Sequence, residues 1–306
     1  MAGPDLTTGI GALTLSTPVM PAAGTFGYGD EYLSLIDPRS LGAIVTKSLS
    51  LTPKEGNPPP RIAEVPGGVV NSIGLENIGV EAFLREKLPS LTGWGVPIIA
   101  SFFGETEDEY LRCAERLGQV EGIAALEANL SCPNVKKGGA LFGRDPSAVL
   151  RITRGVKGVC EAPLWVKLPP DLFRVGDLSE AASEGGADAV TLTNTLPALV
   201  VDLESRRPFL GGGVGGLSGG AIKPVALRLV WEAAKRVRIP VIGVGGIRNG
   251  QDALEFILVG ASAVQVGTAA LSNPRVFQEM VEEIREFMIQ KGISKIEEIR
   301  GKFEFA

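Results

Sequence analysis

The sequence contains no histidine, which removes the most common proton-transfer group and metal ligand found in proteins. Any general base must therefore be a cysteine, aspartate, glutamate, lysine or tyrosine. Cysteine is also scarce, because Cys113, Cys132 and Cys160 form neither a CxxC pair nor an even set that suggests a disulfide framework. Reduced thiols in the cytoplasm fit this pattern best. So few cysteines also cannot ligate a four-cysteine iron–sulfur cluster, and we expect no metal site.

Long apolar runs and an excess of basic residues are missing too. No stretch of about 18 apolar residues occurs, so we expect no membrane-spanning helix. The start of the chain, residues 1–5, lacks the basic and apolar pattern of a secretory signal. The net charge is −5, which argues against a nucleic-acid or anionic-membrane partner, although a local basic pocket for an anionic metabolite remains compatible.

The chain repeats short apolar strands and amphipathic helices along its length. Its 306 residues, 44% of them hydrophobic, suit one large barrel domain covering residues 1–306. Short apolar strands that alternate with helices are typical of a parallel sheet with both faces covered, and eight such units favour a (β/α)8 barrel of the TIM type. The predicted strands cover 19–22, 43–47, 97–102, 124–129, 164–168, 189–193, 241–244 and 263–266. The predicted helices cover 80–91, 105–119, 146–160, 177–184, 222–237, 251–258 and 274–290.

Three other segments complete the predicted architecture. Residues 6–15 predict a short hairpin that plugs the barrel. The connections 48–79 and 196–220 are too long for plain strand-to-helix loops, so we expect both to rise over the active face as walls or a lid. An open, doubly wound sheet is the alternative fold, but the glycine fingerprint of such dinucleotide-binding sheets is incomplete in residues 243–248.

The segment 129–136, NLSCPNVK, follows an apolar strand, so its thiol and amides fall where barrel enzymes place their chemistry. Asparagine side chains there can read a flat polar ring. The alternative is that Cys132 is simply a small buried residue beside turn formers.

Two lysines and several glycines also stand at predicted strand ends. Lys47 and Lys167 each end an apolar strand and need an anionic partner, although a solvated rim lysine or, for Lys167, a Schiff-base lysine are alternatives. Backbone amides at Gly245, Gly246, Gly267 and Thr268 can grip a phosphate, unless these glycines serve only tight turns.

Taken together, these segments resemble the dihydroorotate dehydrogenases, and specifically the class 1B FMN-containing catalytic subunit. The resemblance covers essentially the whole chain. A NAD-dependent complex of this kind pairs the catalytic subunit with an iron–sulfur flavoprotein. The motifs that carry the resemblance are 21–27, 46–48, 71–75, 129–136, 138–139, 142–143, 194–196, 216–219, 222–224 and 243–247.

The resemblance implies oxidation of (S)-dihydroorotate to orotate, in pyrimidine biosynthesis, with FMN bound at the barrel mouth. Cys132 is then the base that takes the C5 proton while hydride passes from C6 to the flavin, with Lys47 as its catalytic neighbour. The implied substrate contacts are Lys47, Asn71, Ser72, Ile73, Gly74, Leu75, Asn129, Asn134, Asn194 and Thr195. The implied FMN contacts are Ala23, Lys47, Ser48, Ser101, Asn129, Lys167, Thr193, Gly219, Gly245, Gly246, Gly267 and Thr268.

The resemblance also implies how electrons leave. A partner subunit carrying FAD and a 2Fe-2S cluster would relay them to NAD⁺, in a heterotetramer built on a homodimer of this chain. Ser101 and Ala23 depart from the asparagine and serine usual in the family, which puts individual flavin hydrogen bonds in doubt. Alternatives are a class 1A fumarate-dependent relative, a tRNA dihydrouridine synthase, an aldolase or isomerase acting on a phosphorylated sugar, and a non-catalytic subunit.

Overall fold

A computed structural model describes residues 3–32, 34–131 and 142–305 of the chain. Its main sheet has eight parallel strands whose spatial order follows their order in the sequence. All eight predicted strands are confirmed, with boundaries that differ by a few residues at most. They are β3 (Val19–Pro21), β4 (Ile44–Val45), β7 (Ile98–Phe102), β8 (Ala125–Asn129), β9 (Leu164–Lys167), β10 (Ala189–Leu192), β15 (Val241–Val244) and β16 (Ala263–Val266).

The first and second strands meet where the sheet closes. The Gly42 N–H donates to the Val19 carbonyl at 2.9 Å, which joins β4 to β3. A Cβ atom at Gly42 would lie only 2.1 Å from the Thr17 carbonyl oxygen, so glycine permits this close approach. The open doubly wound alternative is therefore wrong, and the fold is a (β/α)8 barrel.

Side chains inside the barrel stack in layers, each drawn from alternate strands. Alanines occupy the N-terminal end, and four larger apolar residues lie above them. A layer of three polar residues and one valine follows, and above it Lys167 and the strand ends face the barrel mouth. The three lower layers are Ala43, Ala125, Ala189 and Ala263; Met20, Ile99, Trp165 and Ile242; and Val45, Glu127, Thr191 and Gln265.

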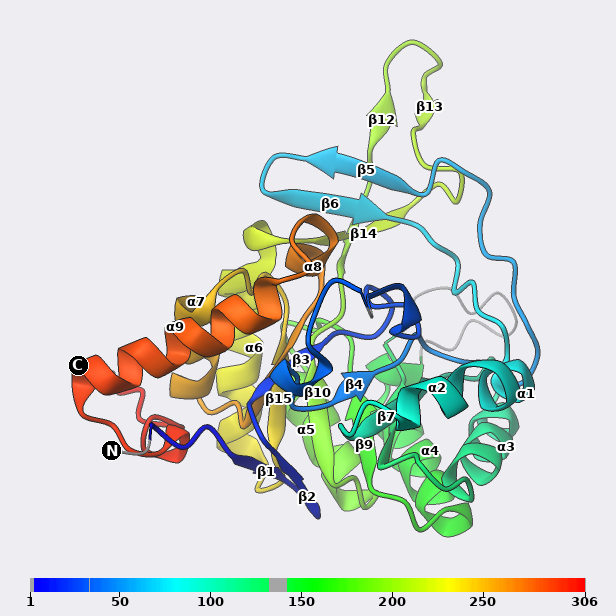
Figure 1. The fold of residues 1–306 in the computed structure, drawn as a ribbon. Helices are drawn as coiled ribbons and strands as arrows, with labels where there is room; N and C mark the ends of the chain where they lie inside the picture. The colour runs from blue at the N-terminus through cyan, green and yellow to red at the C-terminus, as the bar shows by residue number, and fades with distance from the viewer. Residues whose placement is uncertain (1–2, 33, 132–141, 306) are drawn as a thin grey trace.

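Helices cover the outside of the barrel (Figure 1). In α3 the Thr106 side chain accepts the Glu109 N–H at 3.2 Å, so the helix begins later than predicted. Its apolar residues recur every third or fourth position and pack on the barrel. These helices are α3 (Glu107–Gly118), α4 (Pro146–Val159), α5 (Val175–Glu184), α6 (Lys223–Arg236), α7 (Gly250–Leu258) and α9 (Val276–Lys291); the short α8 (Thr268–Ser272) was not predicted.

The predicted helix over 80–91 is a composite of three pieces. It runs through α1 (Val80–Ala82), a π-helical segment (Phe83–Lys87) and α2 (Leu88–Thr92). Pro89 lies in the first turn of α2 and lacks the N–H that an uninterrupted α-helix would use. This missing donor accounts for the break in the regular ladder.

The predicted plug is confirmed at the N-terminal end of the barrel. Strands β1 (Thr8–Ile10) and β2 (Leu13–Leu15) form an antiparallel hairpin, and Ile10 and Leu15 pack against the lowest barrel layers. Figure 1 shows this hairpin at the end of the barrel opposite the long connections.

The two long connections do rise over the opposite end, but they form one structure, not separate walls. Strands from both combine in a four-stranded antiparallel sheet ordered β11–β14–β6–β5, which we call the roof sheet (Figure 1). A small hairpin, β12 (Val201–Asp202) with β13 (Arg207–Pro208), projects beyond it. The strands of the roof sheet are β5 (Ile62–Val65), β6 (Gly68–Asn71), β11 (Leu196–Ala198) and β14 (Gly215–Ser218).

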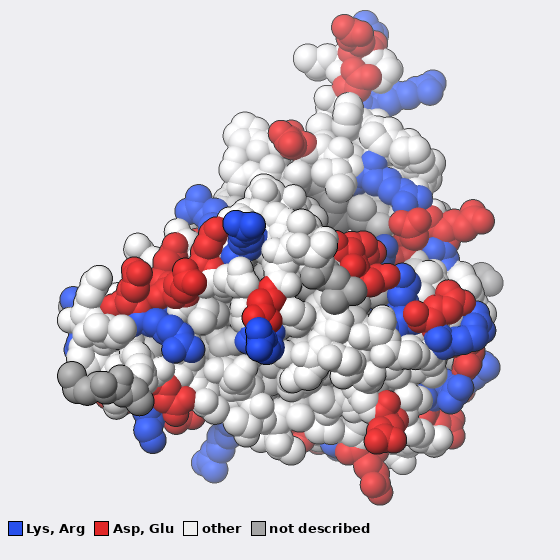
Figure 2. Space-filling model, in the orientation of Figure 1, with Lys and Arg blue, Asp and Glu red and all other residues white. Residues whose placement is uncertain are grey.

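Charged side chains of both signs are interspersed on the face drawn in Figure 2, and no single basic patch gathers there. Among the helices of the described residues, none combines the length and apolar character needed to cross a membrane.

Candidate active site

A cavity of about 930 Å³ lies between the C-terminal ends of the barrel strands and the roof sheet. Its volume falls within the range of about 300–1,000 Å³ typical of cofactor and small-molecule sites. The predicted site residues that line it are Ala23, Lys47, Ser48, Asn71, Ser72, Ile73, Gly74, Leu75, Asn129, Lys167, Thr193, Asn194, Thr195, Gly219, Gly245, Gly246, Gly267 and Thr268.

Cys132 and Asn134 lie outside the described residues, so their predicted roles stay predictions. The chain reaches them from Ser131, which lines the cavity. Cys113 and Cys160 are buried free thiols on or next to helices, away from the cavity. Burial raises the pKa of the Cys113 thiol to about 12, which makes it a poor base at neutral pH.

Ser101 is placed differently from its prediction. It is fully buried and is not among the residues that line the cavity, and its hydroxyl is hydrogen-bonded at 2.8 Å to that of Ser48, which does line it. Its N–H donates to the Thr46 hydroxyl at 3.1 Å. Ser101 therefore supports the side chain of Ser48 through this hydrogen bond. With serine in place of the asparagine usual in the family, Ser48 and not residue 101 forms this part of the cavity wall.

A hydrogen-bonded chain of small polar side chains runs across the C-terminal ends of alternate barrel strands, β4, β8 and β10. The Asn129 amide donates to the Ser48 hydroxyl at 3.2 Å, and its carbonyl oxygen accepts the Ser131 hydroxyl at 2.6 Å. The Asn194 amide donates to the same Ser131 hydroxyl at 2.5 Å. Ser131 therefore helps to fix the orientation of Asn129 and Asn194, two side chains predicted to bind the substrate. Our sequence reasoning did not single it out, although it stands between Asn129 and Cys132.

Lys167 forms part of the cavity floor and is only 4% exposed. Among the described residues its ammonium makes no hydrogen bond or ion pair. Burial lowers the pKa of this ammonium, because a charge is costly in a poorly solvated site, while the charge of Glu127 opposes the change. A positive group held here without a direct partner suits a ligand that carries or gains negative charge.

Lys47 enters the cavity from the end of β4 with an acidic neighbour. Its ammonium lies 3.8 Å from a carboxylate oxygen of Glu76, which also pairs with Arg61 at 2.8 Å. Glu76 was not predicted, because it belongs to a connection with no periodic pattern. Because Lys47 also lines the cavity, its side chain lies within reach of an anionic ligand.

The glycine loop after β15 is held tightly against α6. Gly246 has φ of +76°, and a Cβ atom there would lie 2.6 Å from the backbone nitrogen of Lys223. Lys223 in turn pairs with Asp252 at 2.6 Å, and Asp252 accepts the Arg248 N–H at 2.9 Å. These contacts fix the backbone amides of the loop beside the cavity, as the phosphate prediction requires.

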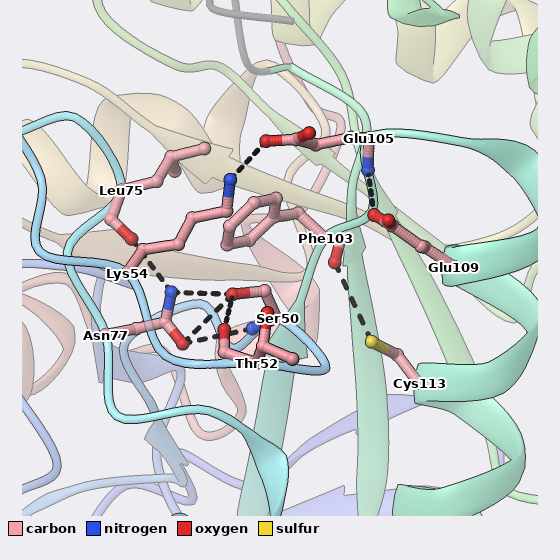
Figure 3. Close-up of polar contacts among 9 residues, drawn as sticks. All are labelled: Ser50, Thr52, Lys54, Leu75, Asn77, Phe103, Glu105, Glu109 and Cys113. Carbon is pink, nitrogen blue, oxygen red and sulfur yellow. Dashed lines mark hydrogen bonds and ion pairs between the residues drawn. The ribbon is translucent and has the colours of Figure 1, made fainter.

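The connection that carries Leu75 is anchored at its base by Asn77 (Figure 3). The buried Asn77 side chain accepts the Ser50 N–H at 3.1 Å and donates to the Ser50 hydroxyl at 2.9 Å and the Leu75 carbonyl at 2.8 Å. Leu75 has φ of +58°, an unusual value for a branched residue. Strained backbone of this kind persists where surrounding contacts determine it, and here it directs residues 71–75 at the cavity.

These groups together can bind a flat polar molecule, hold an anion at the glycine loops and stabilise negative charge over the floor. The comparisons with known proteins agree with that chemistry. A family model described as dihydroorotate dehydrogenase matches residues 5–288.

Curated relatives cover nearly the whole chain. The chain is 49% identical over 301 residues to a protein of Trichlorobacter lovleyi named dihydroorotate dehydrogenase B (NAD(+)), catalytic subunit, covering 98% of this chain and 99% of the relative. A protein of the same name from Citrifermentans bemidjiense is 47% identical over 304 residues, covering 99% of this chain and 100% of the relative. Among solved structures, a dihydroorotate dehydrogenase of Eimeria tenella in complex with ferulenol matches with a TM-score of 0.80 at 25% identity, covering 97% of this chain and 88% of that chain.

Proposed function

The chain belongs to the dihydroorotate dehydrogenase family, and on this premise we propose that it is the catalytic subunit of a NAD-dependent enzyme that oxidises (S)-dihydroorotate to orotate in pyrimidine biosynthesis. The observation that carries the proposal is that Lys47, Lys167 and Asn129 meet the glycine loops in one cavity. One lysine suits the substrate carboxylate, the amide side chains suit its ring, and the second lysine suits a cofactor that gains negative charge.

FMN is the cofactor that these residues fit. The amides of Gly245, Gly246 and Thr268 would hold its phosphate, and Ser48, Asn129 and Lys167 would meet its ring system. When bound, FMN supplies the acceptor for hydride from C6 of the substrate. The Lys167 ammonium would stabilise the negative charge that follows, because it is buried and unpaired among the described residues.

The substrate would lie under the roof sheet. Lys47 would bind its carboxylate, and Asn71, Asn129 and Asn194 would bind ring amides and carbonyls. Contacts with neighbouring residues hold all four side chains: Glu76 pairs with Lys47, and Ser131 bonds to both Asn129 and Asn194. Asn71 donates to the Gly216 carbonyl at 3.2 Å, which ties its side chain to the roof sheet.

Cys132 is the proposed base. It would take the proton from C5 while hydride leaves C6, so the ring loses two electrons and gains its double bond. No histidine exists in the chain, and Cys113 and Cys160 lie away from the cavity. A thiol is effective as a base only when partly ionised, and the positive charges of Lys47 and Lys167, which line the cavity, would favour a thiolate that enters it.

Electrons would then leave through a partner. We propose that residues 1–306 act as one FMN-binding domain, that two copies associate, and that a subunit with FAD and a 2Fe-2S cluster relays electrons to NAD⁺ in the cytoplasm. The names of the curated relatives support this reading, since each describes a NAD(+) enzyme and a catalytic subunit.

The proposal is tested by what the purified protein carries and does. We expect protein isolated without added cofactor to be yellow, to release FMN on denaturation and to convert dihydroorotate to orotate with an artificial electron acceptor. Colourless protein that cannot be reconstituted with FMN would contradict the proposal. Reduction of fumarate by the chain alone would show that fumarate, and not NAD⁺, is the electron acceptor.

A further inference from the structure

Glu127 is an acidic residue sealed inside the barrel. It points inward from the middle of β8 with no exposed surface, and our sequence reasoning gave it no role. Ionised carboxylates are rarely placed in such a position without a compensating positive charge. Its surroundings should therefore show what balances it.

The hydrogen bonds of Glu127 cross the barrel interior. One carboxylate oxygen accepts the Thr191 hydroxyl from β10 at 3.1 Å and the Gln265 amide from β16 at 2.7 Å. Strand β16 is not a neighbour of β8 in the sheet, so this bond can form only through the interior. The other oxygen has no partner among the described residues. Neutral donors thus hold the carboxylate in place but do not balance its charge.

The nearest layer above contains the positive charge. Thr191, which binds Glu127, is paired in register with Lys167 on β9. Lys167 is also paired with Asn129, which lies two residues after Glu127 on β8. Lys167 is also buried and has no direct partner among the described residues. Other charged side chains that line the cavity above it are Lys47, Glu76, Arg144 and Arg248.

We propose that Glu127 is the counter-charge of Lys167: a carboxylate one layer beneath the floor that keeps this lysine positively charged where it faces the cavity. Glu127 is a positioning residue, because it acts on the ligand only through Lys167. Without it, desolvation alone would act on the ammonium and favour the neutral amine. That the positive charge serves FMN rests on the function proposed above, whereas the coupling of the two side chains does not.

The direct test is the titration of Lys167 in protein labelled with an NMR-active carbon at lysine Cε. The Lys167 resonance is identified as the one missing from Lys167→Met. In Glu127→Gln we expect the acid dissociation constant of the Lys167 ammonium to rise by about tenfold or more, since a full negative charge is lost from the next layer of the barrel. An unchanged titration of Lys167 would overturn the proposal. The measurement does not require FMN to be bound.

Thr191→Val is the matched control. It removes one hydrogen bond from the same carboxylate at nearly constant volume and leaves the charge, so Lys167 should titrate as in the wild type. A rise as large as that in Glu127→Gln would mean that disturbed packing causes the effect, and would also overturn the proposal.

A stability cycle keeps the proposal testable if Glu127→Gln alone does not fold. Lys167→Met leaves the carboxylate without its counter-charge, so we expect a lower denaturant midpoint than in the wild type. Adding Glu127→Gln to Lys167→Met should then raise the midpoint again. A double variant no more stable than Lys167→Met would show that the two side chains are not coupled.

Discussion

In the proposed reaction the thiol of Cys132 would act as the base, a role that a histidine imidazole fills in many enzymes, and this chain contains no histidine. Replacing it should remove proton transfer without removing the cavity, since the residues that line the cavity are unchanged.

In Cys132→Ala we therefore expect FMN and substrate binding to persist while the rate of flavin reduction by dihydroorotate falls by about 10²–10⁴-fold. Anaerobic stopped-flow absorbance measures that rate. Cys113→Ala is the control, because its thiol is buried in α3 and should affect only packing. Reduction near the wild-type rate in Cys132→Ala would mean that another group is the base.

Ser131 matters through the two amides that it holds. Ser131→Ala removes the hydroxyl that joins Asn129 to Asn194, so both side chains can turn away from the cavity that they line. We expect the KM for dihydroorotate to rise by about tenfold, the equivalent of roughly one or two hydrogen bonds. Ser179→Ala, which removes an equally buried hydroxyl from α5, should leave the KM unchanged. Equal KM values in the two variants would remove Ser131 from the site.

The residue scale also shows where prediction from sequence succeeds and fails. Lys47 and Lys167 could be predicted because a charged residue at the end of an apolar strand has few other places to go. The position of Ser101 could not, because whether a short side chain lines the cavity or lies behind its wall depends on Ser48, which belongs to the connection after β4. Glu127 was missed since it looks like one residue of an ordinary buried strand.

At the scale of elements, the loop after β15 depends on glycine geometry. Gly246→Ala would add a Cβ at positive φ against the Lys223 backbone, so we expect a loss of about 1–3 kcal/mol in stability and weaker FMN retention. Flavin content per protein after gel filtration measures the second effect. Gly95→Ala is the matched control, because its φ is +70° but no atom lies within 4 Å of the added Cβ. Full flavin retention in Gly246→Ala would contradict the phosphate assignment.

Elements with strong periodicity were predicted well, and the roof sheet was not. The barrel strands are buried on both sides and stand out in the sequence as short apolar runs, so their positions follow from the local sequence pattern. The roof sheet pairs Asn71 with Gly216, far apart in the sequence, across short strands rich in glycine. Local patterns carry no signal for such a pairing, although the length of both connections did predict that they cover the active face.

At the scale of the whole molecule, the account requires a partner for electron transfer to NAD⁺. The isolated chain should reduce an artificial acceptor with dihydroorotate but reduce NAD⁺ poorly, because nothing in its sequence provides the ligands of an iron–sulfur relay. Adding the FAD and 2Fe-2S subunit should restore NADH formation, followed by absorbance. Efficient NAD⁺ reduction by this chain alone would contradict the division of labour.

The central claim is that dihydroorotate bound in this cavity passes its electrons to FMN held by the same chain. An anaerobic titration of the purified yellow protein with dihydroorotate tests it most directly. We expect the visible flavin absorbance to bleach in proportion to the substrate added and orotate to form in an amount equal to the FMN reduced. A flavin band that persists under saturating dihydroorotate would contradict it.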